Sequence, residues 1–347
     1  MMDVSRSSTL KVILINVILI MVFSFLAFAL IEWTLRLYIP DTDHTGMNET
    51  APPPLFYRIK PNFSGILEGV KVSINSDGFR DDEFDRDRPE NQRLIAVLGD
   101  SITFGQGVPQ DKTFPAVLER RLNVSGPKGA YAVWNLGVPG YNTQQELAVF
   151  KSFVLPQRPH WVFLVYVIND VEPVNEGALR IIAGDRSHET PGWLSNQIDR
   201  SIGIQIVKNR LGRIVRWFRP DWYFSSYVDD AISQYEGDGA PWIEVSKMIE
   251  SMKLACESEG IRFTVVMTPS MMDFRNYPFE KINRTVELFC RDRGIDYIDL
   301  LPYFRNSDPS ELAVSMIDAH PNALAHEIMA KAILERIRKE ETEAGKQ

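Results

Sequence analysis

The sequence contains little cysteine and little histidine, and these shortages exclude several classes of protein. Its only cysteines are Cys256 and Cys290, and it has no Cys-x-x-Cys pair, which excludes a disulfide scaffold and a zinc ribbon. Two interpretations of the cysteines remain open: a disulfide, if the domain is exported, or two small buried apolar side chains, which we favour. Five histidines occur without a His-Glu-x-x-His motif, so we expect no metal and no cofactor.

The sequence also contains fewer basic than acidic residues. Lys and Arg number 38 against 46 Asp and Glu, so the formal net charge is −8. A nucleic-acid-binding protein would carry a basic face to neutralise phosphates, and we therefore expect no nucleic-acid partner. Hydrophobic residues make up 44% and charged residues 24% of the chain, which is typical of a globular protein and excludes a disordered one.

The N-terminal segment contains the longest apolar run. In 12–31, only Asn16 and Ser24 are not apolar, and as a helix this run would reach about 30 Å, the thickness of the bilayer's hydrocarbon core. We predict a transmembrane anchor over 12–34. The alternative is a signal peptide cleaved after the small-x-small sequence of 27–29; we favour the anchor because the run is longer than the apolar region of a typical signal peptide.

Charges on the two sides of this span predict its orientation. Arg6 and Lys11 precede the span, whereas Arg36 is the only basic residue between it and Arg58. Because cytoplasmic flanks carry the excess of basic residues, we expect residues 1–11 in the cytoplasm and the rest of the chain outside it.

A lead-in region and one large domain follow the anchor. Residues 35–90 contain three consecutive prolines at 52–54, typical of a tether, and then alternate apolar and polar residues around 70–74, which predicts a short β-hairpin with its turn at 75–78. Residues 91–342 alternate apolar runs with amphipathic segments, which predicts a parallel sheet with helices on both faces. The expected strands are 94–98, 131–136, 161–167, 263–267 and 297–300, and the expected helices are 113–123, 143–155, 243–259, 279–293 and 322–339.

One stretch interrupts this alternation. Residues 171–242 form a connection far longer than usual, typical of a lid or a binding loop. Within it, 200–219 carries six basic residues and no acidic one. This segment is either a solvated surface helix, the interpretation we slightly favour, or a basic amphipathic element that lies on anionic lipid headgroups beside the anchor.

Polar residues that suit catalysis follow the predicted strands. Ser101 comes after the first strand and is a candidate nucleophile, Gly140 and Asn169 follow the second and third and are candidate oxyanion donors, and Asp318 and His320 precede the last helix as a candidate acid and base. Taken singly, each is more simply a turn or a helix cap. Together they supply a nucleophile, a base, an orienting acid and two oxyanion donors, which indicates a serine hydrolase.

The same segments, in this order, resemble the signature blocks of the SGNH (GDSL-type) hydrolase superfamily. Gly99-Asp100-Ser101 matches the first block, Gly140 the second, Asn169-Asp170 the third, and Asp318 with His320 the fifth; the resemblance covers roughly residues 70–340. It implies a three-layer α/β/α flavodoxin-like sandwich around a five-stranded parallel sheet. It also implies Ser101 as nucleophile, His320 and Asp318 as its partners, and an oxyanion hole of the Ser101 and Gly140 backbone N–H groups with the Asn169 side chain.

Two positions depart from the superfamily's pattern. Val167 stands where the third block usually has glycine, and one residue fewer than usual separates Asp318 from His320. We expect a membrane-anchored serine esterase that hydrolyses acyl or acetyl esters, with an acylated carbohydrate or lipid as substrate and membrane lipid as a further partner. The alternatives are an O-acyltransferase acting on a glycan and a catalytically silent, glycan-binding scaffold on the same fold.

Overall fold

The structure is a computed structural model. It describes residues 3–38, 46–89, 91–125, 129–172, 220–238, 240–315 and 318–344. The basic segment 200–219 and most of the predicted insertion lie outside the described residues. Both interpretations of that segment therefore remain predictions.

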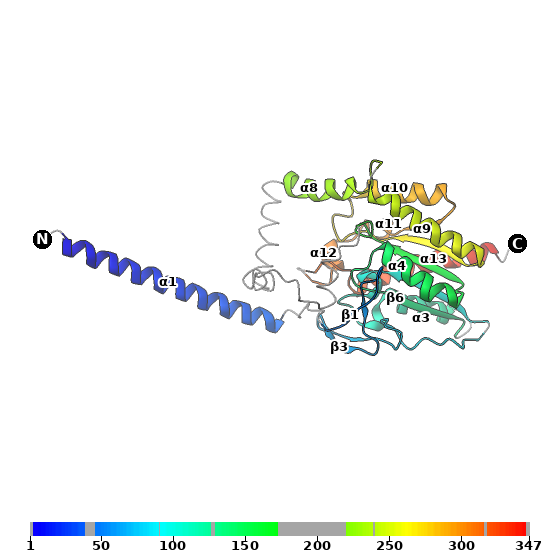
Figure 1. Ribbon diagram of the computed structural model, residues 1–347, viewed down its shortest axis with the longest axis horizontal. Helices are drawn as coiled ribbons and strands as arrows, with labels where there is room; N and C mark the ends of the chain where they lie inside the picture. The colour runs from blue at the N-terminus through cyan, green and yellow to red at the C-terminus, as the bar shows by residue number, and fades with distance from the viewer. Residues whose placement is uncertain are drawn as a thin grey trace.

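A five-stranded parallel sheet forms the centre of the domain (Figure 1). Its spatial order is β6-β5-β7-β8-β9, which confirms the parallel α/β sheet that the sequence predicts. The strands are β5 (Arg93–Gly99), β6 (Tyr131–Gly137), β7 (Trp161–Tyr166), β8 (Arg262–Met267) and β9 (Asp296–Asp299).

Helices cover both faces of this sheet. Helix α3 (Phe114–Ser125) packs against α13 (Ala323–Ala344), and α4 (Thr143–Val149) packs against α9 (Pro241–Ser258). Right-handed crossovers between parallel strands place α4, α9 and α10 (Glu280–Asp292) on one face and α3 on the other. The molecule therefore has the three layers of the flavodoxin-like arrangement, as predicted.

Shorter elements complete the domain. The predicted helix 143–155 is α4 continued by a π-helical turn, η2 (Phe150–Val154), and a 3₁₀ turn, η3 (Leu155–Gln157). Five further elements of the domain are α2 (Ser101–Phe104), η1 (Gln110–Lys112), α8 (Pro220–Ser233), α11 (Leu301–Phe304) and α12 (Pro309–Leu312).

The central strands are buried on both faces, which explains their continuous apolar sequences. Every residue of β7 is buried, and six of the seven residues of β5 are buried. Parallel strands covered by helices on both sides need apolar side chains at every position rather than at alternate ones. This requirement is why the strands could be predicted from sequence.

The lead-in region contains two antiparallel pairs, and one expectation for it was wrong. β1 (Asn48–Thr50) pairs with β2 (Tyr57–Ile59), and β3 (Ser64–Leu67) pairs with β4 (Val70–Ser73). The hairpin turn is Glu68–Gly69, not 75–78, because two loop residues with positive φ close a tight turn between paired strands. Residues 75–78 form a separate turn after β4, closed by the Gly78 N–H donating to the Asn75 carbonyl at 3.1 Å.

This lead-in packs into the core of the domain. Met47, Tyr57 and Ile59 are fully buried and belong to the same apolar cluster as the sheet. Arg80 is also buried, and its guanidinium donates to the carbonyls of Gly105 at 2.5 Å and Val108 at 2.6 Å. The lead-in is thus joined to the segment that follows β5.

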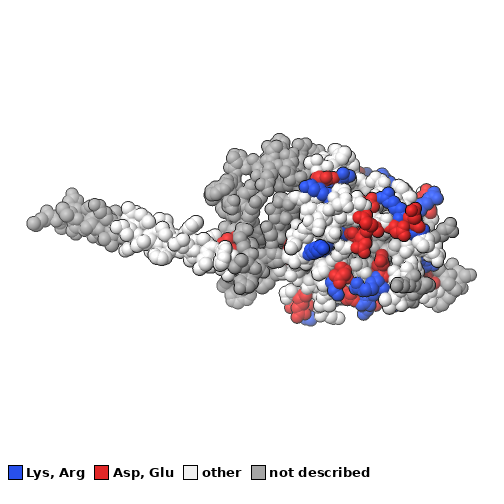
Figure 2. Space-filling view, turned by 90° about the horizontal axis from the view of Figure 1, so that it is seen from below, with Lys and Arg blue, Asp and Glu red and all other residues white. Residues whose placement is uncertain are grey.

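Helix α1 (Asp3–Tyr38) has a different character from the rest of the chain. Its segment Ile13–Thr34 is long and apolar enough to cross a membrane, and no part of the segment is buried within the protein. In the space-filling view of Figure 2 this segment shows almost no charge, whereas acidic and basic side chains are interspersed over the visible face of the domain. The helix is therefore either a membrane anchor or a signal sequence.

Candidate active site

The candidate nucleophile lies at the carboxyl end of β5, at the start of a short helix. Asp100 caps helix α2, and its carboxylate accepts from the Ile102 N–H at 2.8 Å. Ser101 is the first residue of α2. The helix fits against the ends of two strands because both end in glycine: a Cβ on Gly99 would lie 2.2 Å from Thr103 Oγ1, and one on Gly137 would lie 2.2 Å from Phe104 N.

The structure brings Ser101, His320 and Asp318 together, although 219 positions separate Ser101 from His320. His320 Nε2 lies 2.9 Å from Ser101 Oγ, and His320 Nδ1 lies 2.6 Å from Asp318 Oδ1. These contacts form the chain of a nucleophile, a base and an orienting acid that serine hydrolases require.

The short spacing between Asp318 and His320 is accommodated by the backbone. Asp318 Oδ1 accepts from both the His320 ring and the His320 backbone N–H, the latter at 2.9 Å. One carboxylate oxygen therefore fixes the position and the orientation of the imidazole. The loop is closed further by the Val314 N–H, which donates to the His320 carbonyl at 2.9 Å.

The candidate oxyanion donors lie at the same edge of the sheet. Gly99 is paired in register with Gly137, so Gly140 follows β6 just as Ser101 follows β5. Asn169 follows the neighbouring strand β7, and its side chain is exposed. Among the described residues, no hydrogen bond engages the Asn169 side chain.

The turn that carries Asn169 does not need the glycine that Val167 replaces. Asp170 closes this turn, because its N–H donates to the Val167 carbonyl at 3.1 Å and its carboxyl accepts from the Val167 N–H at 2.8 Å. Val167 is not among the residues with positive φ. The departure from the superfamily's pattern therefore introduces no backbone strain here.

The electrostatic surroundings favour a protonatable imidazole beside an ionised acid. Burial lowers the pKa of His320, but the hydrogen bond and the charge of Asp318, with smaller contributions from Asp100 and Glu68, outweigh burial and raise it. Burial raises the pKa of Asp318, but its hydrogen bonds with the ring and the backbone N–H of His320, together with the charge of His320, hold that pKa below the usual range. Such a pair stabilises the imidazolium that forms when His320 takes a proton.

Three carboxyl groups are buried close to one another at the base of the site. Burial raises the pKa values of Asp100, Glu146 and Asp170, and mutual repulsion raises those of Glu146 and Asp170 further. Both carboxyl oxygens of Glu146 are buried without a hydrogen-bond partner among the described residues. A buried carboxyl in this situation is held in its neutral form.

One residue near this site could not be predicted from the sequence. Glu68, in the β3–β4 turn, lies buried, and its Oε1 accepts from Gln106 Nε2 at 2.6 Å. An Ile-Leu-Glu-Gly-Val sequence at 66–70 marks a turn, but nothing in it shows which distant residue the glutamate reaches. His326, expected to be structural, is fully buried and accepts from the Phe114 N–H at 3.0 Å, and burial lowers its pKa to about 3.

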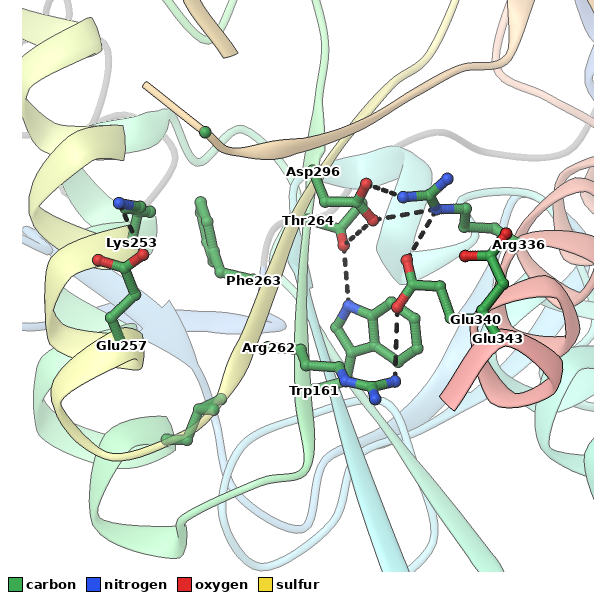
Figure 3. Close-up of a pocket in the computed structure, with 12 residues that line it drawn as sticks. Trp161, Lys253, Glu257, Arg262, Phe263, Thr264, Asp296, Arg336, Glu340 and Glu343 are labelled. Carbon is green, nitrogen blue, oxygen red and sulfur yellow. Dashed lines mark hydrogen bonds and ion pairs between the residues drawn. The ribbon is translucent and has the colours of Figure 1, made fainter. Parts of the chain in front are cut away.

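Two cavities lie elsewhere on the domain. The first, of 480 Å³, lies at the amino ends of β7, β8 and β9, the edge opposite Ser101. Several of its charged groups pair with one another: Arg336 bonds to Asp296 and Glu340 (Figure 3). The second, of 730 Å³, lies between the β3–β4 hairpin and α3. Neither is lined by Ser101, so neither belongs to the candidate site.

A family model described as the GDSL-like Lipase/Acylhydrolase family matches residues 97–328. The matched range begins within β5 and ends within α13, and it includes Ser101, Gly140, Asn169, Asp318 and His320. It does not include the lead-in hairpin. Among curated proteins, none matches the chain.

The solved structures that resemble this chain have low sequence identity to it. One is Axe2, an acetylxylan esterase from Geobacillus stearothermophilus, with 17% identity and a TM-score of 0.43 over 72% of this chain and 96% of that one. Another is LAE5, an alpha/beta hydrolase enzyme from the metagenome of Lake Arreo, Spain, with 16% identity and a TM-score of 0.42 over 70% of this chain and 94% of that one.

Proposed function

The chain belongs to the GDSL-like lipase/acylhydrolase family and is a hydrolase of ester bonds, and we propose that Ser101, His320 and Asp318 carry out the hydrolysis. The observation that supports this proposal most is the chain of contacts from Ser101 Oγ to His320 Nε2 at 2.9 Å and from His320 Nδ1 to Asp318 at 2.6 Å. A serine hydroxyl is a weak nucleophile unless an adjacent base accepts its proton.

In the first half of the proposed reaction, His320 accepts the Ser101 proton while Oγ attacks the ester carbonyl. Asp318 holds the imidazole through Nδ1 and stabilises the imidazolium. The carbonyl oxygen becomes an oxyanion, which the Ser101 and Gly140 N–H groups and the Asn169 amide stabilise. The C–O bond to the alcohol then breaks, and the alcohol leaves with the proton from His320.

In the second half, the acyl group is released from Ser101. His320 accepts a proton from water, the resulting hydroxide attacks the acyl-enzyme carbonyl, and the proton returns to Ser101 Oγ as the carboxylic acid departs. If a sugar hydroxyl replaces water, the same groups perform O-acyl transfer. Partition between the two outcomes depends on which acceptor binds, so both products have to be measured.

The direct test is hydrolysis of 4-nitrophenyl acetate by the full chain in detergent. We expect the native protein to release 4-nitrophenol, and Ser101→Ala to lose about 10⁴-fold or more in kcat. Ser258→Ala, at an exposed serine on α9, is the matched control and should retain activity. Equal rates for native protein and Ser101→Ala would refute the proposal, and mass spectrometry with an added glycan acceptor separates transfer from hydrolysis.

We also propose that α1 is an uncleaved membrane anchor and that the esterase domain lies outside the cytoplasm. The supporting observation is the unburied apolar segment Ile13–Thr34, which is long enough to span a bilayer. We expect the full-length protein to remain in membranes after alkaline carbonate extraction. An intact mass that lacks residues 1–29 would instead identify a cleaved signal peptide.

A further inference from the structure

The loop that carries Gly140 is a tight turn whose central peptide has a defined direction. The turn runs from Val138 to Tyr141, and the Tyr141 N–H closes it by donating to the Val138 carbonyl at 3.1 Å. Proline in the second position and glycine in the third, at φ +79°, are typical of a type II turn. Types I and II differ by a rotation of about 180° of the peptide between these two residues. The turn type therefore decides on which side of the loop the Gly140 N–H lies.

The carbonyl of that central peptide is held by Tyr57, the first residue of β2. Tyr57 Oη donates to the Pro139 carbonyl at 2.6 Å, although 82 positions separate the two residues. In a trans peptide the carbonyl and the following N–H point in opposite directions. A hydrogen bond that fixes the Pro139 carbonyl therefore also fixes the direction of the Gly140 N–H, which is the donor proposed for the oxyanion hole.

The Gly140 N–H is available to a ligand. Gly140 is exposed, whereas Tyr57 is fully buried. Within the described part of the chain, no backbone carbonyl accepts from the Gly140 N–H. A carbonyl that accepts a hydrogen bond polarises its peptide, and this makes the N–H of the same peptide a stronger donor. The Tyr57 hydroxyl can thus orient the Gly140 N–H and strengthen it.

Several contacts hold Tyr57 in place against this loop. The Tyr141 hydroxyl donates to the Tyr57 carbonyl at 2.7 Å, and the two rings pack edge to face with their centroids 5.2 Å apart. Gln145 Nε2, in α4, donates to the Leu55 carbonyl at 2.7 Å. Burial raises the pKa of the Tyr57 hydroxyl, which therefore stays protonated and able to donate.

We propose that Tyr57, which lies outside the residues that the family model matches, is a positioning residue of the oxyanion hole: its hydroxyl holds the Pro139–Gly140 peptide so that the Gly140 N–H faces the ester carbonyl. This inference rests on the proposed roles of Ser101 and Gly140. It assigns the lead-in region a part in the reaction.

Tyr57→Phe removes only the hydroxyl that holds the turn. Without this contact the Pro139–Gly140 peptide samples other orientations, so the oxyanion loses part of one donor. Complete loss of a donor typically lowers kcat by about 10²–10³-fold. We expect a smaller loss for Tyr57→Phe, about tenfold in kcat on 4-nitrophenyl acetate with KM changed less than about twofold. A native kcat in this variant would overturn the proposal.

Tyr297→Phe is the matched control. The Tyr297 hydroxyl also donates to a backbone carbonyl, that of Asn283, at 3.3 Å. Tyr297 lies in β9, at the edge of the sheet opposite β6. This variant loses the same kind of hydrogen bond far from the proposed oxyanion hole, and it should retain the native kcat.

A change of one substrate atom separates positioning from a structural role. In O-(4-nitrophenyl) thioacetate, sulfur replaces the carbonyl oxygen and accepts hydrogen bonds only weakly, so the oxyanion donors contribute less to its hydrolysis. We expect Tyr57→Phe to lower kcat on this ester by less than about twofold. Losses of equal size on both esters would mean that the substitution only disturbs the structure, and would overturn the proposal.

A readout without turnover keeps this inference separable from the proposed function. The sequence contains two Pro-Gly pairs, 139–140 and 191–192. Carbonyl-¹³C proline and ¹⁵N-glycine labelling of the full chain in detergent therefore gives two HNCO signals, which Gly192→Ala assigns. We expect the Gly140 signal to move in Tyr57→Phe and to stay in Tyr297→Phe.

The two failures give different results. An unmoved Gly140 signal in Tyr57→Phe would contradict the positioning role whatever the activity of Ser101. A signal that moves, together with Ser101→Ala hydrolysing esters at the native rate, would instead refute the proposed function, and the positioning role with it.

Discussion

At the scale of single residues, the geometry of the site depends on side chains that follow strands at one edge of the sheet. The sequence predicted Ser101, His320 and Asp318 as partners because each falls after a strand or before the last helix, and the structure brings them into contact. The fine geometry could not be predicted: the backbone hydrogen bond that compensates for the short Asp318–His320 spacing depends on how the loop folds.

Glu68 marks the limit of prediction at this scale. Its partner Gln106 lies 38 positions along the chain. Hydrophobic periodicity locates the turn in which Glu68 lies, but periodicity carries no information about which distant side chain a turn residue reaches. Only tertiary packing defines that contact.

Asn169 offers a test of the oxyanion hole. Asn169→Ala removes one proposed donor, and losing such a donor typically lowers kcat by about 10²–10³-fold. Because the side chain is exposed and makes no hydrogen bond with the described residues, the melting temperature should change little. Steady-state kinetics on 4-nitrophenyl acetate, with Asn306→Ala at an exposed position after α11 as control, measures the effect; a loss below threefold would exclude Asn169 from the oxyanion hole.

At the scale of elements, hydrogen bonds from the lead-in region hold the end of the helix that carries Ser101. Arg80 lies in the lead-in, and its guanidinium bonds to the carbonyls of Phe104, Gly105 and Val108, at and beyond the end of α2. It also lies 5.0 Å from the centre of the Phe104 ring. A planar group with several donors can satisfy separate carbonyls at once. The sequence pattern predicts a hairpin in this region but carries no information about this attachment.

Arg80→Lys should therefore destabilise the protein despite conserving charge. A single ammonium cannot reach the separate carbonyls of Gly105 and Val108, so we expect a loss of about 2–4 kcal/mol in the free energy of unfolding. Urea denaturation followed by tryptophan fluorescence measures it. Arg58→Lys, at an exposed pair with Glu49, should change the free energy of unfolding by less than about 0.5 kcal/mol. Equal midpoints of urea denaturation for Arg80→Lys and Arg58→Lys would contradict this role of Arg80.

The strands and the lead-in hairpin differ in how well sequence predicts them. Strands β5 and β7 need apolar side chains on both faces, and that need produces continuous apolar runs. The hairpin strands β3 and β4 are only four residues each and partly exposed. Their pairing depends on whether the chain turns at 68–69 or at 75–78. The hairpin turn forms at Glu68–Gly69, although glutamate is unfavourable at positive φ.

At the scale of the whole molecule, the buried carboxyl groups make stability depend on pH. Burial raises the pKa of Glu146 well above its ordinary value of 4.5. Between 4.5 and its folded pKa, the folded state holds more protons than the unfolded state. The free energy of unfolding therefore decreases as pH rises through this range, and the contribution of a neutral Glu146 is fully present only below about pH 4.5.

Glu146→Gln tests this dependence. It removes the ionisable group and supplies an amide that can donate to Asp170, whose Oδ1 has no partner among the described residues. We expect the variant to be more stable than the native protein by about 1–3 kcal/mol at pH 8, with the difference shrinking toward pH 4. Glu244→Gln, at an exposed pair on α9, is the control. A difference that grows as pH falls would contradict the assignment.

The stretch of chain between the apolar helix and the domain is short. Ile13–Thr34 is unburied, whereas the lead-in from Met47 onward belongs to the core. If α1 is an anchor, the catalytic domain is therefore joined to the membrane through residues 35–46 and not through the whole of 35–90. This short connection would keep the esterase close to the bilayer surface.

The most direct measurement of the central claim is covalent labelling by a fluorophosphonate. The phosphonate reacts only with a serine whose proton an adjacent base removes, so it reports the Ser101–His320 contact without requiring a known substrate. We expect intact-protein mass spectrometry to show one phosphonyl group on the native chain, none on Ser101→Ala, and much slower labelling of His320→Ala. Labelling of Ser101→Ala at the native rate, or no labelling of the native chain, would contradict the account.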